Sequence, residues 1–358
     1  MTGLSVPAYA QHYDGLRPVP WRRMAWVTWR QHRTALAGLA VFLGALAVCL
    51  WRLGLGLHHA YAAAAACHPA TSPVCDGLQN SFNAMDGFLS NGYNLQAVPA
   101  LIGAFVAAPV LARELETGTF RYAWTQGISR WRWTLAKLVP LAVAVMIAAA
   151  AFSILLSWYY RPYFATGNLF LPEESPLANM FALRGVAFAA WALVAFSIGG
   201  LAGMLIRRVV PAIAATLAVY LGLAIVAGLY IREHYLTPLV AKNLFNPPAS
   251  AWILRQWWTE GGRAVNQSAI NQVQNSLFFR LLPVVHHSAG KGSDVKAQKL
   301  QVNLHILHYL SQRGYTQWTS YQPASRFWPF QWIEGGALLA LSVLLIAITV
   351  WLVRRRAA

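Results

Sequence analysis

The sequence predicts an all-α membrane protein with six transmembrane helices. Apolar residues make up 57% of the chain and charged residues only 11%, a balance outside the usual range of soluble domains. Six apolar runs have the length of about 17 to 25 residues that a bilayer-spanning helix needs. They are 35–55, 95–112, 138–158, 185–206, 209–231 and 335–353.

These runs divide the chain into four parts. Residues 1–34 form a basic N-terminal segment, in which Trp21, Trp26 and Trp29 among arginines predict a helix over 19–34 at the membrane interface. Residues 35–231 hold the first five spans and a charged loop over 113–137. Residues 232–332 form a segment outside the membrane, and 333–358 hold the sixth span and a basic tail.

The net charge of +17 would suggest a nucleic-acid partner in a soluble protein. Here the cations gather beside the spans, so the bilayer explains them better and no nucleic-acid partner is expected. Cations of the N-terminal segment, the 113–137 loop and the tail fall on one side of six spans. By the positive-inside rule we expect a multi-pass protein of the cell membrane with both termini cytoplasmic.

The first outer loop holds Cys67 and Cys75, while Cys49 lies inside the first span. An oxidising compartment favours a disulfide between the loop pair; two free thiols are the alternative. Ala64 to Cys67 weakly matches a signal-cleavage site, but an uncleaved first span is the better interpretation.

The outer segment is expected to be largely helical, with helices near 250–260, 269–282 and 295–312. A strand is the alternative for the last of these, because Leu300, Val302, Leu304 and Ile306 also alternate with polar residues.

The interiors of the apolar runs contain no Asp, Glu, Lys, Arg or His. Arg52, Lys137, Arg184 and Glu334 fall near run ends, where a cation can reach the interface and Glu334 can face a helix N-terminus. Coupling to an ion gradient is therefore disfavoured. The sequence from Gly290 to Ser293 lacks the spacing of a phosphate-binding loop, so any energy must come from another polypeptide.

Histidines are the main argument for an enzyme or metal site. His286 is adjacent to His287, and His305 and His308 can share a helix face. No third ligand is visible beside either pair, so we interpret them as surface residues and predict no metal ligand and no catalytic residue.

Small residues recur at four-residue spacing in the fourth span, at Ala195, Gly199 and Gly203. This pattern predicts close helix packing. Packing within the chain is favoured over an interface between two copies.

Three stretches carry a resemblance to a known family. They are Trp29 to Arg33, the loop pattern from Arg113 to Thr119 followed by Ser129, Arg130 and Lys137, and Tyr321 to Gln331. With these stretches, the chain resembles the type-2 permeases of ABC transporters (ABC-2), most closely those of actinobacteria.

The resemblance implies two permease subunits, as a homodimer or related heterodimer, above two ABC ATPase subunits. In such permeases the loop after the second span forms a coupling helix that sits in a groove of the ATPase. Glu114 and Glu116 are expected to stabilise a helix start there, and Arg121 and Arg130 offer bidentate contacts. A solvated loop without a partner is the alternative. The residues carried over to this role are Arg113, Glu114, Glu116, Gly118, Thr119, Arg121 and Arg130.

Together these features predict the permease subunit of an ATP-driven exporter of an amphipathic or hydrophobic solute, such as a drug, peptide or lipid. The chain itself is expected to bind no cofactor, and ATP and Mg belong to the ATPase. The alternative is a membrane-anchored enzyme or sensor that acts through its outer segment.

Overall fold

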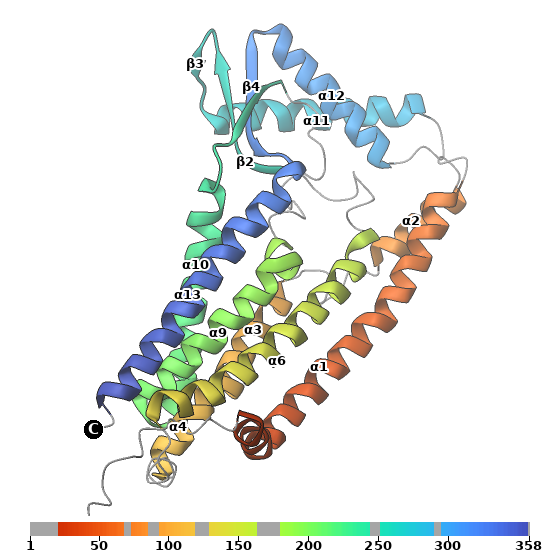
Figure 1. The fold of residues 1–358 in the computed structure, drawn as a ribbon. Coiled ribbons are helices and arrows are strands. Elements are labelled where there is room, and N and C mark those ends of the chain that lie inside the picture. Colours follow the sequence, from red (N-terminus) through yellow and green to blue (C-terminus); the bar gives the residue numbers. More distant parts are fainter. Residues whose placement is uncertain are drawn as a thin grey trace, which may run out of the picture.

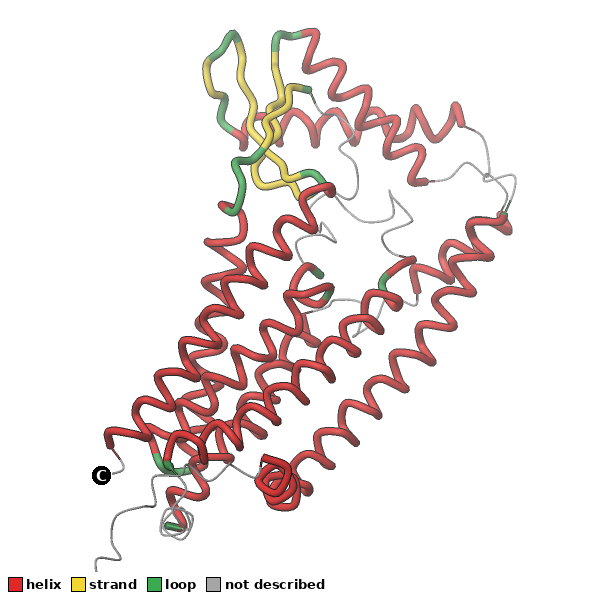
Figure 2. The backbone as a smooth tube through the Cα atoms, in the orientation of Figure 1, coloured by secondary structure: helices red, strands yellow, loops and turns green. Residues whose placement is uncertain are grey.

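The computed structural model of the protein describes residues 21–67, 73–84, 93–118, 129–162, 180–243, 251–289 and 295–356. Helices dominate, and six of them are long and apolar enough to cross a membrane. The predicted fold class is therefore confirmed. A small β-sheet lies beyond one end of the helix bundle (Figure 2).

The six spans follow the predicted order, and five extend beyond their apolar runs because the helices continue into flanking polar residues. They cover Leu36–Ala66, Ala97–Thr117, Arg130–Tyr159, Gly185–Ile206, Val209–His234 and Ala324–Arg355.

Three spans are single helices or parts of one, and three contain a change of helix type. The single helices are α1 (Trp21–Ala66), α6 (Arg130–Tyr159) and α9 (Gly185–Ile206). The second span joins α3 (Ala97–Ile102), the π-helical η2 (Gly103–Ala107) and α4 (Ala108–Thr117). The fifth joins α10 (Val209–Val226), the π-helical η4 (Ala227–Ile231) and η5 (Arg232–His234), and the sixth joins η6 (Ala324–Arg326) and α13 (Phe327–Arg356).

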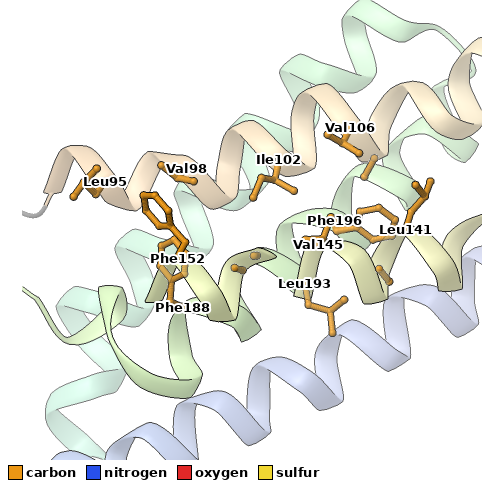
Figure 3. Close-up of a cluster of buried hydrophobic side chains, with 14 of the residues drawn as sticks. Leu95, Val98, Ile102, Val106, Leu141, Val145, Phe152, Phe188, Leu193 and Phe196 are labelled. Atoms are coloured by element: carbon orange, nitrogen blue, oxygen red, sulfur yellow. The ribbon is translucent and has the colours of Figure 1, made fainter. Parts of the chain in front are cut away.

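The fourth span, α9, lies at the centre of the bundle. In its most apolar stretch 78% of residues are buried, whereas 6% are buried in the first span. Figure 3 shows Phe188, Leu193 and Phe196 of α9 among side chains of the second and third spans. The neighbours drawn there are Leu95, Val98, Ile102, Val106, Leu141, Val145 and Phe152. The exposed apolar side chains of the peripheral helices are suited to contact with lipid.

Helix α1 begins at Trp21, inside the stretch predicted to lie at the interface, and continues without a break into the first span. In Figure 1 its first turns are seen nearly end-on, whereas the rest of α1 runs along the bundle. The first turns therefore lie across the bundle end, as an interfacial helix does.

The outer segment contains a four-stranded antiparallel sheet that the sequence did not predict. Its strand order is β1-β4-β2-β3. The strands are β1 (Leu239–Lys242), β2 (Trp252–Glu260), β3 (Arg263–Ala264) and β4 (Tyr315–Gln322). The helix predicted near 250–260 is wrong: this stretch is β2, which is rich in the aromatic and β-branched residues that favour strands.

Two helices pack on one face of this sheet: α11 (Gln267–Ala289) and α12 (Val295–Gln312). Trp258 of β2 is buried there with Ile270, Val302, Ile306 and Leu310. The outer segment thus has a small apolar core of its own. The strand alternative for 295–312 is wrong, because this stretch is a continuous helix that buries Val302, Ile306 and Leu310 at four-residue spacing, while Leu304 is exposed.

The remaining described elements are short. A disulfide joins Cys67, directly after α1, to Cys75 of α2 (Pro73–Ala84). The others are η1 (Tyr93–Gln96) and η3 (Phe181–Leu183).

Candidate coupling site

The charged stretch predicted to contact an ATPase begins in the last turn of α4. Arg113 is exposed there, and the Thr117 hydroxyl donates to the Arg113 carbonyl oxygen over 2.8 Å. Gly118 ends the helix with a φ of 72°, a left-handed conformation that glycine adopts without strain. Thr119 and Arg121 lie outside the described residues.

Glu114 and Glu116 lie near the C-terminal end of α4 and not at its start. The helix start that Glu116 contacts is that of α10 (Val209–Val226). Carboxylates at this position face the negative end of the helix dipole. Both carboxylates have partners on other spans that compensate for this.

Glu114 forms an ion pair with Lys137 of α6. The side chains are 13% and 7% exposed, and the Lys137 ammonium also lies 4.5 Å from the centre of the Trp133 ring. Lys137 was expected near a span end, reaching for the interface. Instead it is buried about two turns inside α6, where it links the second span to the third.

Glu116 links the second span to the fifth. Its Oε2 accepts a hydrogen bond from the backbone N–H of Val209, over 3.2 Å. Val209 is the first residue of α10, whose preceding residue, Arg208, supplies no side-chain cap. A carboxylate is favourable at this free N–H and at the positive end of the α10 dipole.

The small residues of α9 form a third link, between the second and fourth spans. A Cβ atom on Gly199 would overlap the carbonyl oxygen of Gly103, and one on Gly203 would overlap that of Ala108. Ala195 in turn faces Gly103. The ladder Ala195, Gly199, Gly203 is therefore occupied by backbone of the same chain.

Arg130 begins α6 on the other side of the undescribed part of the loop, and its carbonyl oxygen accepts from the Thr134 hydroxyl over 3.0 Å. The structure thus places Arg113, Glu114 and Glu116 in the last two turns of α4, Gly118 at its C-cap and Arg130 at the start of the next span.

A second charged cluster, which the sequence did not predict, lies at the end of the bundle next to the β-sheet. Glu334 lies about two turns inside α13 and is 1% exposed. Arg232 donates to it from Nε and Nη2, each over 2.9 Å. Trp191 Nε1 donates over 2.7 Å and the Tyr235 hydroxyl over 3.0 Å. The expectation that Glu334 faces a helix N-terminus is wrong.

This outer cluster joins the fourth, fifth and sixth spans to the start of the outer segment. Burial and the Glu334 carboxylate both raise the pKa of the Tyr235 phenol above its ordinary value, so Tyr235 remains a donor. In the sequence, Arg232 follows the fifth apolar run and Glu334 precedes the sixth. That pattern alone does not indicate that the two side chains are in contact.

The histidines of the described ranges lie apart from one another or within single helices. In the described ranges, no three His, Cys, Asp or Glu side chains lie close enough together to hold an ion. His305 contacts the Gln301 carbonyl and His308 the Gln312 side chain, each within its own helix.

The sequence was also compared with known proteins. Residues 39–232 match the family described as ABC-2 membrane transporter related. No curated protein and no solved structure gave a match. The matched range covers more than half of the chain, from the first span to the end of the fifth. The chain is therefore a multi-pass membrane protein of the ABC-2 family, whose members are the membrane-spanning subunits of ABC transporters.

Proposed function

We propose that this chain is the permease of an ATP-driven exporter. Two copies, or one copy and a related permease, pair with two ABC ATPase subunits in the cell membrane and move an amphipathic or hydrophobic solute out of the cytoplasm. ATP and Mg bind to the ATPase, and this chain supplies the path and the mechanical link.

The observation that carries the proposal is the set of links at the end of α4. Glu114 ties this helix to α6, and Glu116 ties it to α10. Gly199 and Gly203 hold α9 against the same span at van der Waals distance. A displacement of the segment after α4 is therefore passed directly to four of the six spans.

The charged side chains at the C-terminal end of α4 support a docking role. The carboxylates of Glu114 and Glu116 bind groups of the same chain, whereas the Arg113 side chain is exposed. An exposed guanidinium is suited to a bidentate contact with a carboxylate of a partner.

Charge reversal of Arg113 tests this role. The chain is co-expressed with a candidate ABC ATPase partner, and co-purification and ATP hydrolysis are measured. We expect R113E to weaken co-purification about tenfold, as the loss of one charge-assisted contact does. The matched control is R354E, which reverses another exposed cation, near the end of α13. Equal retention of the ATPase by R113E and wild type would contradict the docking role.

A further inference from the structure

The two faces of the outer sheet differ in burial. Trp258 points toward α11 and α12 and is buried. Its neighbour Trp257 lies on the opposite face and is 36% exposed. Because side chains alternate along a strand, Arg255 and the paired residues Ser320 and Trp318 of β4 share the face of Trp257.

This second face is aromatic and cationic. The rings of Trp257 and Trp318 are nearly parallel, with centroids 6.3 Å apart, and the ammonium of Lys242 lies 4.8 Å from the Trp318 centroid. Arg255 is exposed, and no carboxylate in the described ranges forms an ion pair with it.

A pocket of about 740 Å³ lies between this face and the outer end of the fifth span. Its volume is within the range of about 300–1,000 Å³ that is typical of small-molecule sites. Its lining comes from both sides. Glu233 and His234 end the span and Pro238 follows it, whereas Leu254, Arg255, Gln256, Trp257 and Ser320 belong to the sheet.

A β-bulge shapes the sheet side of the pocket. Ile253 pairs with Tyr321 and Arg255 with Ser320, so Leu254 is an extra residue in β2. Bulges redirect side chains and are frequent beside functional sites. This one brings Leu254 and Arg255, an apolar and a cationic side chain, to the same pocket.

The pocket adjoins the end of the fifth span, where a helix that crosses a bilayer meets the headgroups. Glu233 and His234 end the fifth span, and the residues just before them, Leu229, Tyr230 and Ile231, are large, apolar and exposed. A ligand there meets the Arg255 guanidinium and the Trp257 ring at its head, with Glu233 also in the lining. Below lies an apolar helix surface, along which an alkyl chain is shielded from water.

We propose that this pocket binds the phosphate headgroup of an amphiphile in the outer half of the membrane. Arg255 supplies the bidentate contact that a phosphate favours, Trp257 forms the wall, and the alkyl chain runs along the fifth span. That the bound amphiphile is an exported solute rests on the proposed transport function, whereas binding itself does not.

Binding of radiolabelled hexadecyl phosphate to the full-length protein in a neutral maltoside detergent tests the proposal. No ATPase or ATP is present, so failure of transport does not affect the result. We expect saturable binding that R255Q weakens about tenfold, the effect of removing one charge-assisted contact. The matched control, R263Q, changes an exposed cation on β3 outside the pocket and should bind as wild type does.

Competition measurements and a further variant test which part of the ligand the pocket recognises. Hexadecanol, which has the chain without the phosphate, should not compete, and inorganic phosphate should compete only weakly. E233Q, which removes the acid of the pocket, should bind at least as tightly as wild type. Equal binding to R255Q and R263Q, or full competition by hexadecanol, would overturn the proposal.

Discussion

Glu114 and Lys137 are 23 positions apart in the sequence and form a buried ion pair at one end of the helix bundle. Their contact joins the second span to the third at the point where the chain leaves and re-enters the bundle. The two spans are therefore fixed to each other beside the ends of the charged loop.

Loss of one partner of this pair should destabilise the protein. In E114A the Lys137 ammonium stays buried without its carboxylate, which typically costs about 3–5 kcal/mol. We expect a clearly lower thermal midpoint in detergent, measured by fluorescence-detected gel filtration.

The double variant E114M/K137M is the matched control. It removes both charges and fills their space with apolar side chains, so most of the lost stability should return. A double variant no more stable than E114A would show that the ion pair is not what holds these helices together.

Close packing of α9 on the second span predicts that Gly203 tolerates no larger side chain. In G203V a Cβ atom would collide with the carbonyl oxygen of Ala108, so the helices must separate. We expect a strong loss of folded protein after extraction. Nothing lies within 4 Å of a Cβ atom on Gly222, so G222V should be folded as wild type is. Equal yields of the two variants would contradict the packing.

The outer cluster predicts a role for the Tyr235 hydroxyl. Y235F removes its hydrogen bond to the Glu334 carboxylate, and a hydrogen bond to a charged group contributes about 1.5–3 kcal/mol. We expect a lower thermal midpoint. Tyr230, whose side chain is 64% exposed, provides the control variant Y230F, which should leave the midpoint unchanged. Equal thermal midpoints for Y235F and Y230F would contradict a stabilising role of the Tyr235 hydroxyl.

The sequence contains most of the information about the spans and little about their charged contacts. Six apolar runs were visible because a helix in lipid needs a long apolar surface. The pair of Arg232 and Glu334 was not visible, because the residues are 102 positions apart and each lies close enough to a span end to be interpreted as interfacial. Which polar groups meet is decided by how the helices pack.

The outer sheet was missed for a local reason. In β2, Trp257 and Trp258 are adjacent and the bulge at Leu254 interrupts the alternation of inward and outward residues. The stretch therefore lacks the regular period of a strand. Pairing with β4, which lies far along the chain, decides its conformation.

The three cysteines give a prediction that needs no activity. Cys67 and Cys75 form a disulfide, whereas Cys49 is free. Alkylation of the unfolded protein without reductant should therefore add one label per chain, and alkylation after reduction should add three. Mass spectrometry reads this directly. Three labels without reductant would show free thiols at both loop positions.

The central claim is that ATP hydrolysis by a partner drives solute movement through these spans. The most direct measurement is accumulation of the amphipathic dye rhodamine 6G in inside-out vesicles that contain the chain with or without its ATPase. We expect accumulation against the dye gradient only when the ATPase and ATP are both present. Accumulation against that gradient by this chain alone, with every ATPase removed, would contradict it.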